Sequence, residues 1–286
     1  MEARYRLRLA EREASKATQE QLDWAKMFPV AKLVEHEAIP KPADSSERVR
    51  ILMEFFGVAS VEAWHQIFDR QRAAYRQSSS FKSAGAAVAS WIRMGEKAAE
   101  EIRCQSYDRG AFLEALRIVR SVTTERVSKW YPEMMERCAE AGVAVVLVRE
   151  LPKTRLSGAA RWLTKDKALI QLSLRHKRDD HFWFSFFHEA GHVLLHGKKQ
   201  WFLDDAKNGT GEAEEEADRF AADFLIDPAA IGAFCERGDF GGAAIKQFAD
   251  EQGIAPGIVV GRLQHEGFIE YRYHNKLKVQ LKWADD

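Results

Sequence analysis

The spacing of hydrophobic positions changes along this chain of 286 residues, at about residue 141. Before that point, apolar residues recur at intervals of three and four, which is the period of an amphipathic helix. After Pro42, Asp44 or Ser45 can cap such a helix, whose apolar positions are Val49, Leu52, Met53 and Phe56. The pattern predicts that the first part of the chain is mainly helical.

Four further segments of the first part have helical composition or spacing. They span residues 1–26, 61–76, 84–103 and 109–121. Between two of them, "RQSSSFKSAG" (76–85) is rich in serine and contains glycine, which favours a loop. These elements together make up a predicted helical domain of residues 1–130.

After residue 141, short β-branched runs alternate with helical segments, which predicts an α+β fold. The predicted strands are 142–151, 158–163, 168–176 and 276–283; the second and third form a β-hairpin, and the last alternates strictly. The predicted helices are 181–196, 212–226, 241–251 and 256–266, with a polar loop at 197–211. We therefore expect a second domain over residues 131–286.

Composition narrows the functions that the chain can have. Lys plus Arg and Asp plus Glu each number 43, so charge gives no reason for binding nucleic acid or an anionic membrane. No uncharged apolar run reaches the roughly 18 residues of a membrane span, and the N-terminus lacks the apolar core of a signal peptide. Three separated cysteines, Cys104, Cys138 and Cys235, form no CxxC pair, which is typical of reduced thiols in the cytoplasm.

One stretch, "HFWFSFFHEAGHVLLHG" (181–197), places titratable residues within an apolar helix. His188 and His192 are four positions apart, so they share one helical face and can bind one metal ion. Glu189 then lies beside the metal, where it can take a proton from zinc-bound water and later pass one to the leaving amine. The apolar flanks argue against solvated surface histidines, and Ala190 and Gly191 keep the helix slim for close packing.

A zinc site with two histidines needs a third protein ligand. Position 198 is Lys where the HExxHxxGxxH pattern has its third histidine, which excludes that pattern. In "EEEAD" (214–218), Glu214 can bind the metal, while Asp218, one turn later, accepts a hydrogen bond from a ligand histidine. Glu216 is the alternative ligand, and a solvated acidic first turn is the alternative account of the run.

The combination of "FFHEAGHVLLHG" with "EEEADRFAADFLIDP" resembles the ImmA/IrrE family of metallopeptidases, in which an HExxH helix precedes a helix of the pattern E-x-x-A-[ND]-x-F-A. The similarity extends over about residues 140–265. It implies a zincin-like domain with a Zn2+ cofactor. It also implies a cytoplasmic endopeptidase whose protein substrate is a helix-turn-helix repressor, cleaved to induce stress or mobile-element genes.

The first part of the chain is similar to the region behind a HigA-like helix-turn-helix antitoxin domain in longer proteins that carry this peptidase. We expect residues 1–130 to be a recognition or regulatory module, and whether a DNA-binding domain precedes them stays open. The segment 245–267 has the cadence of a helix-turn-helix but no basic excess, so direct DNA binding is not expected.

Several smaller candidates stay open. His196 lies at the end of its helix, where a histidine interacts favourably with the helix dipole. It could also support the metal site or contact the substrate. The residue that stabilises the oxyanion could be Tyr271, Tyr273, His181 or Arg161, and spacing selects none of them. The segment "ALIQLSLR" is either an interior hairpin strand or an edge that pairs with an extended substrate.

Two functions fit these observations. In the first, the chain is a zinc endopeptidase in which His188, His192 and Glu214 bind the metal. In the second, it is a catalytically latent zinc-binding interaction protein of a toxin–antitoxin or stress-response system. Glu189 favours the first function, because a purely structural zinc site has no use for a general base.

Overall fold

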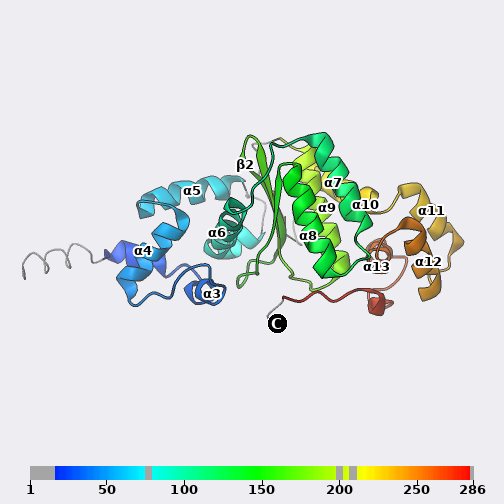
Figure 1. Cartoon of the computed structure of the whole chain (residues 1–286). Coiled ribbons are helices and arrows are strands. Elements are labelled where there is room, and N and C mark those ends of the chain that lie inside the picture. Colours follow the sequence, from blue (N-terminus) through cyan, green and yellow to red (C-terminus); the bar gives the residue numbers. More distant parts are fainter. Residues whose placement is uncertain (1–16, 75–78, 198–201, 206–210, 284–286) are drawn as a thin grey trace, which may run out of the picture.

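Helices lie on both faces of a central β-sheet in the computed structural model, which describes residues 17–74, 79–197, 202–205 and 211–283. Figure 1 shows the N-terminal helices on one side of the sheet and most of the later helices on the other. The chain therefore has the predicted α+β architecture, with a mainly helical first part.

Capping residues mark the ends of several N-terminal helices. They are α2 (Gln19–Ala25), α3 (Val30–Glu35), α4 (Ser45–Phe56), α5 (Val61–Ala74) and α6 (Ser79–Glu100). The side chain of Asp44 accepts a hydrogen bond from the backbone N–H of Glu47 at 2.8 Å and so caps α4. Gly57 ends α4 in the left-handed conformation (φ 66°), which glycine adopts without steric cost.

The loop predicted for residues 76–85 is wrong from Ser79 onward, because α6 begins there. Residues 75–78 lie outside the described part of the chain. Ala84 has non-helical backbone angles, so this segment of small residues is accommodated by a kink within the helix. Of the helix predicted for residues 1–26, only the part from residue 17 is described, and it contains α2.

Within the described residues, the sheet has four strands in the order β1-β3-β2-β4. They are β1 (Val143–Leu147), β2 (Leu156–Thr164), β3 (Lys167–Leu172) and β4 (Phe202–Asp205). The predicted hairpin is confirmed, since β2 and β3 pair antiparallel, and β1 pairs parallel with β3. β4 pairs antiparallel with β2 inside the segment predicted as a polar loop, because four residues are too few for a periodic signal.

Both faces of the sheet are buried, which explains the continuous apolar run of β1. Val143 and Val145 join the core on one face, whereas Ala144 and Val146 join the core of the N-terminal helices on the other. β3 pairs with a neighbouring strand along each edge. The interpretation of "ALIQLSLR" as an interior strand is thereby confirmed, and β3 has no free edge for an extended substrate.

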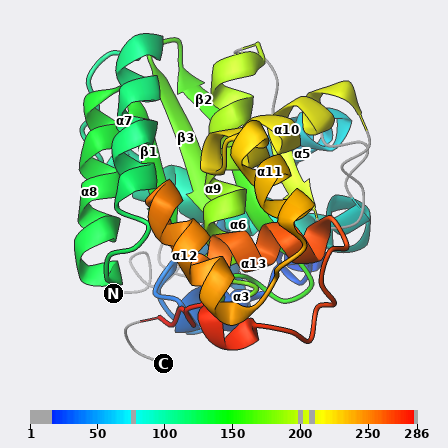
Figure 2. The ribbon, with the colours of Figure 1, turned by 90° about the vertical axis from the view of Figure 1, so that its right-hand side faces the viewer.

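The second set of helices covers the face opposite to α2–α6. It consists of α7 (Arg109–Ser121), α8 (Val127–Glu140), α9 (Asp179–Leu195), α10 (Glu212–Leu225), α11 (Pro228–Arg237), α12 (Gly242–Gln252) and α13 (Pro256–His265). Every helix predicted for this part of the chain is confirmed, while α8 and α11 are additional. α9 packs against β2 and β3, and both α10 and α13 pack against α9 (Figure 2).

The helices α7 and α8 share one buried core with the sheet and α9. Phe112 of α7, Trp130 of α8 and Trp183 of α9 all belong to this core. The helix α8 runs across residue 130, where the sequence predicts the boundary between two domains. The division into residues 1–130 and 131–286 stays a prediction.

The strand predicted for residues 276–283 is wrong. A 3-10 helix, η1 (Asn275–Leu277), is followed by extended chain, in which the isolated bridge from Gln280 to Arg178 is the β-pairing among described residues. Burial does not alternate along this segment: the side chain of Lys278 turns inward and Leu281 is buried, while Val279 is 54% exposed. The backbone N–H of Val279 donates to Oδ1 of Asp179 at 2.9 Å, which fastens the tail to α9.

A buried ion pair joins this tail to the start of α9. The Nζ of Lys278 lies 2.5 Å from Oδ2 of Asp180 and 2.6 Å from Oε1 of Gln264 in α13. A Cβ on Gly261 of α13 would lie 2.9 Å from the Cβ of Asp180, so this glycine makes room for the pair. The tail, α13 and α9 are therefore held together by one polar cluster.

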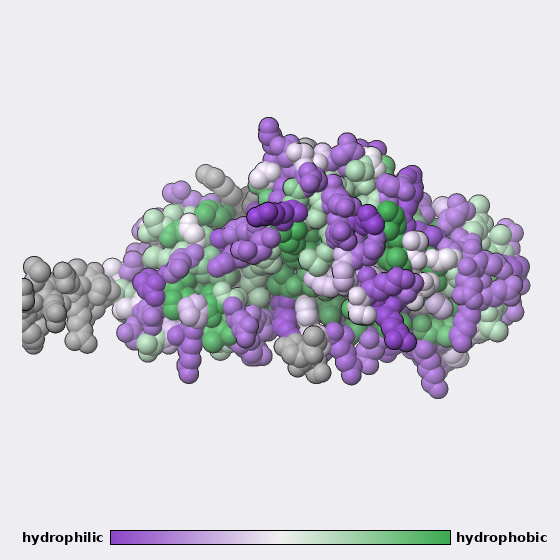
Figure 3. Space-filling model, in the orientation of Figure 1, coloured by the Kyte–Doolittle hydropathy of each residue, from purple (hydrophilic) through white to green (hydrophobic). Residues whose placement is uncertain are grey.

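No helix in the described residues is long and apolar enough to cross a membrane. Figure 3 shows polar residues over much of one face of the molecule, with smaller apolar areas among them. Large exposed apolar side chains come from separate elements, for example Ile67, Leu195 and Phe268.

Replacing Lys278 with methionine should lower the free energy of unfolding by about 3–5 kcal/mol, because the carboxylate of Asp180 would stay buried without its cation. Urea unfolding measured by circular dichroism tests this expectation. Lys276→Met is the matched control, since Lys276 is exposed. Equal stability of the two variants would contradict the role given to the ion pair.

Candidate metal centre

The helix α9 carries polar residues although it is buried over most of its length. Its aromatic residues account for this burial, because they belong to the core that the sheet shares with the surrounding helices; they are Phe182, Trp183, Phe186 and Phe187. Asp179 and Asp180 lie in its first turn, where the helix dipole favours negative charge. The apolar run before the HExxH pattern therefore places the HExxH residues in the interior of the protein.

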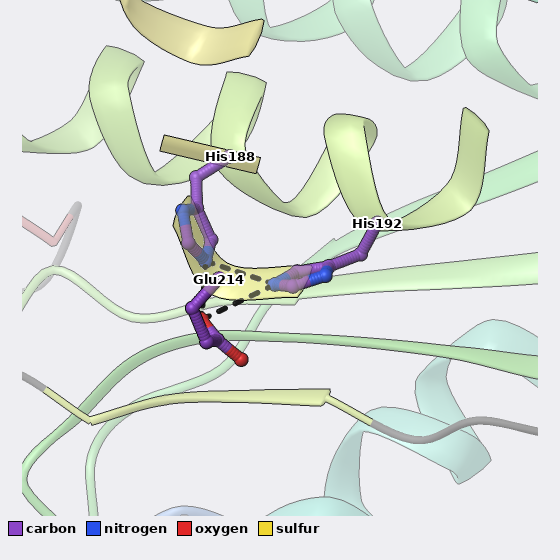
Figure 4. A group of neighbouring side chains, drawn as sticks. All are labelled: His188, His192 and Glu214. Carbon is purple, nitrogen blue, oxygen red and sulfur yellow. Dashed lines mark hydrogen bonds and ion pairs between the residues drawn. The ribbon is translucent and has the colours of Figure 1, made fainter. Parts of the chain in front are cut away.

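Three side chains from α9 and α10 converge on one point, as Figure 4 shows. The Nε2 atoms of His188 and His192 are 3.0 Å apart, and Oε2 of Glu214 lies 3.2 Å from the first and 3.5 Å from the second. Both histidines are buried, and the side chain of Glu214 is 20% exposed. The structure therefore brings together the three residues that the sequence predicts as ligands.

These donor atoms suit a divalent metal ion such as zinc. Zinc holds nitrogen and oxygen ligands at roughly 2.0–2.2 Å, so tetrahedral ligand atoms stand about 3.3–3.6 Å from one another. The observed separations of 3.0, 3.2 and 3.5 Å are close to these values. In the described part of the chain, this is the one group of histidine, cysteine and acidic side chains with such an arrangement.

The charge states of Glu214 and His192 also suit a cation. Burial would raise the pKa of Glu214, but its contacts with His188 and His192 outweigh burial and lower this pKa to about 2. Burial lowers the pKa of His192 to about 4. Near neutral pH, Glu214 is therefore ionised, and the imidazole of His192 is neutral with a lone pair available.

Asp218 holds the ring of His188 from the side away from Glu214. Its Oδ1 lies 2.8 Å from Nδ1 of His188, so the hydrogen bond predicted from the spacing of the acidic run is confirmed. With Nδ1 donating to a carboxylate, Nε2 of His188 keeps its lone pair on the side of Glu214.

Glu216, the alternative ligand, does not join this group. Its Oε2 lies 3.1 Å from Nε2 of His196, and Nδ1 of His196 lies 3.0 Å from Nδ1 of His192. The account of His196 as a residue at the helix end near the dipole misses both contacts. The contact with Glu216 arises because α10 packs back against α9, which local spacing does not encode, whereas His196 and His192 are one helical turn apart.

Glu189 is fully buried and lies against the strand β2. A Cβ on Gly158 would come within 2.4 Å of Oε1 of Glu189, so the missing side chain at this position provides the space for the carboxylate. The sequence analysis missed Gly158. The available signal was a glycine inside a strand, which often marks close approach of another group.

A second glycine lets α10 approach α9. A Cβ on Gly191 would lie 3.2 Å from Cα of Ala217 and 3.1 Å from Cδ1 of Phe220. The prediction that Gly191 permits close packing is confirmed, because α10 contacts α9 at this position. This approach is what carries Glu214 to the two histidines.

The four candidates for stabilising an oxyanion lie in different places. Arg161 pairs with Glu96 of α6 on the face of the sheet opposite to α9, so the geometry excludes it. His181 lies in the first turn of α9 with a half-exposed side chain. Tyr271 and Tyr273 lie in the segment after α13 and are 68% and 46% exposed.

Comparison with known families agrees with this geometry. Residues 141–239 match the family model Peptidase_M78, described as the IrrE N-terminal-like domain. The matched range runs from the turn before β1 into the residues after α11, and it contains His188, His192 and Glu214. A search of curated proteins found no match to the chain.

Replacing Gly158 with alanine should lower the free energy of unfolding by roughly 1–3 kcal/mol, because the added methyl group would overlap the carboxylate of Glu189. Thermal and urea unfolding measure the change. Gly232→Ala on α11 is the control, since a Cβ there meets no atom within 4 Å. A Gly158→Ala variant as stable as the wild type would show that Glu189 is not held against β2.

Proposed function

Because residues 141–239 form an IrrE N-terminal-like domain, which belongs to a metallopeptidase family, we propose that the chain is a zinc-dependent endopeptidase that hydrolyses a peptide bond in a protein partner. The convergence of His188, His192 and Glu214 carries the proposal. Together with the buried Glu189, they supply the three ligands and the general base that an HExxH peptidase needs.

The residues of α9 and α10 divide the work of holding the metal. Bound zinc would polarise the scissile carbonyl and lower the pKa of water. His188, His192 and Glu214 hold the ion, and Asp218 orients His188 through Nδ1. Three protein ligands are the number that catalytic rather than structural zinc sites have.

Glu189 acts as the general base. Its carboxylate takes a proton from the attacking water and returns a proton to the leaving amine. Two observations support this role: Glu189 follows the ligand His188 directly on α9, and its side chain is shielded from bulk water against Gly158. A carboxylate held at one place in a dry site needs little reorganisation during the reaction.

A protein substrate follows from the peptidase family, and the resemblance to ImmA/IrrE proteins narrows it to a cytoplasmic helix-turn-helix repressor or antitoxin. We propose that the attacked bond lies in an exposed or flexible segment of that partner. The helices α2–α6 pack on the face of the sheet opposite to α9, so we assign them recognition or regulation rather than catalysis.

Purified chain should contain about one zinc ion per molecule after reconstitution, as expected for three converging ligands. Glu214→Ala should lose most of this metal, because two histidines alone bind it weakly, whereas Glu189→Gln should keep it. Elemental analysis of dialysed protein measures the content. Glu215→Ala, on the neighbouring exposed position, is the control. Absence of zinc from the reconstituted wild type would overturn the proposed metal site.

Wild-type chain should generate new protein N-termini in a lysate of its host, and Glu189→Gln should generate none, because the general base is lost while the ligands remain. Isotope labelling of N-termini followed by mass spectrometry identifies the cut sites. The same sites should vanish when a chelator is added. If zinc is bound and neither form cuts any protein, the chain is the latent zinc-binding interaction protein instead.

A further inference from the structure

A row of side chains leads from His192 to the surface of the protein. The Nδ1 atoms of His192 and His196 are 3.0 Å apart, and Nε2 of His196 lies 3.1 Å from Oε2 of Glu216. Exposure rises along the row: the side chain of His192 is fully buried, that of His196 is 8% exposed and that of Glu216 is 47% exposed. The row joins the end of α9 to the first half of α10.

The backbone at the end of α9 places His196 for this contact. The helix stops at Leu195, and His196 has extended backbone angles (φ −109°, ψ 160°) while its N–H still donates to the carbonyl of His192 at 3.2 Å. Its ring therefore returns over the preceding turn, with its centroid 5.0 Å from that of His192. A histidine that only interacted with the helix dipole would not need to place its ring against that of His192.

The hydrogen bonds of the row have one consistent direction. If Nε2 of His192 binds a metal, its ring proton is on Nδ1 and is donated to Nδ1 of His196. His196 then accepts at Nδ1, so its own proton is on Nε2 and is donated to the carboxylate of Glu216. Each imidazole thus uses one nitrogen as donor and the other as acceptor or ligand.

The two ligand histidines have unequal support as a result. His188 reaches the carboxylate of Asp218 directly, at 2.8 Å. His192 reaches the carboxylate of Glu216 only through His196. Without His196, the Nδ1–H of a buried ring would lose this acceptor, and the ring could rotate away from the metal.

We propose that His196 and Glu216 are positioning residues that fix the ring orientation and the tautomer of His192 for metal binding. The proposal rests on the metal site of the proposed function but not on peptidase activity. It gives Glu216, which the sequence offers as an alternative ligand, a role without direct contact to the metal. It also makes the end of α9 part of the metal site.

The test compares variants of His196 by their zinc affinity, measured in competition with a chromophoric chelator. His196→Leu removes both hydrogen bonds and should raise the Kd roughly 10–100-fold, the usual cost of losing such a partner. His196→Gln should stay within about threefold of the wild type, because its amide oxygen can accept from His192 while its NH2 donates to Glu216. Thermal unfolding of the metal-free proteins shows whether either variant is misfolded.

Glu216→Ala provides an independent test, because Glu216 is exposed and its replacement should not impair folding. It should raise the Kd less than His196→Leu does, since the half-exposed carboxylate is screened by solvent. In the His196→Leu background, Glu216→Ala should add nothing, because Glu216 acts through His196. Glu215→Ala, the exposed neighbour on α10, should leave the Kd unchanged in both backgrounds.

The outcomes separate this inference from the proposed function. The positioning role is supported if zinc affinity falls in His196→Leu and is retained in His196→Gln. It is supported further if Glu216→Ala lowers the affinity no more in the His196→Leu background. Equal losses in the leucine and glutamine variants would overturn it in favour of ring packing, and so would an unchanged Kd in His196→Leu. Failure of the wild type to bind any divalent metal would overturn the proposed function, and this inference with it.

Discussion

The burial of α9 is the constraint on which the rest of the structure depends. A buried titratable side chain that lacks a partner costs several kcal/mol, and α9 carries five titratable residues within its buried length. Neighbouring elements supply groups to them in turn: Asp218 to His188, Glu214 to both histidines, and Lys278 to Asp180. The helices and the tail around α9 are therefore placed by its polar groups as much as by its aromatic ones.

Glycine residues allow these elements to come close enough to α9 to make these contacts. Gly158 in β2 makes room for Glu189, Gly191 lets α10 approach, and Gly261 in α13 accommodates Asp180. Each lies where a Cβ would overlap or crowd a neighbour on which the site depends. The polar residues of the site and the glycines around it form one set, because the hydrogen bonds and ion pairs require backbone distances that larger side chains would prevent.

The parts that the sequence predicted depend on local geometry. Helical pitch places His188 beside His192 and Glu214 beside Asp218, whereas the contact of Glu214 with the two histidines depends on the packing of α10 against α9. The contact between His196 and Glu216 could not be predicted from helical pitch, because it also arises where α10 meets α9. Gly158 was missed for the same reason, since it is distant in sequence from Glu189 and meets it only in the folded protein.

The tail shows that an alternating sequence need not form a strand. Residues 276–283 alternate in sequence as a strand does, but their burial does not alternate, because Lys278 and Leu281 are both buried and Val279 is exposed. Periodicity in the sequence does not decide by itself which side chains are buried, because their partners decide it. A buried lysine needs a carboxylate, and Asp180 provides it from the start of α9.

The sheet also lies between the N-terminal helices and Glu189. Arg161 of β2 pairs with Glu96 of α6, and the side chain of Gln171 in β3 donates to the carbonyl of Trp91 at 2.7 Å. These contacts fix α6 to the two strands, and β2 forms the wall against Glu189 through Gly158. The strand β2 therefore contacts both α6 and Glu189. α6 also contacts β1, whereas the residues of the candidate metal site lie on α9 and α10, on the other face of the sheet.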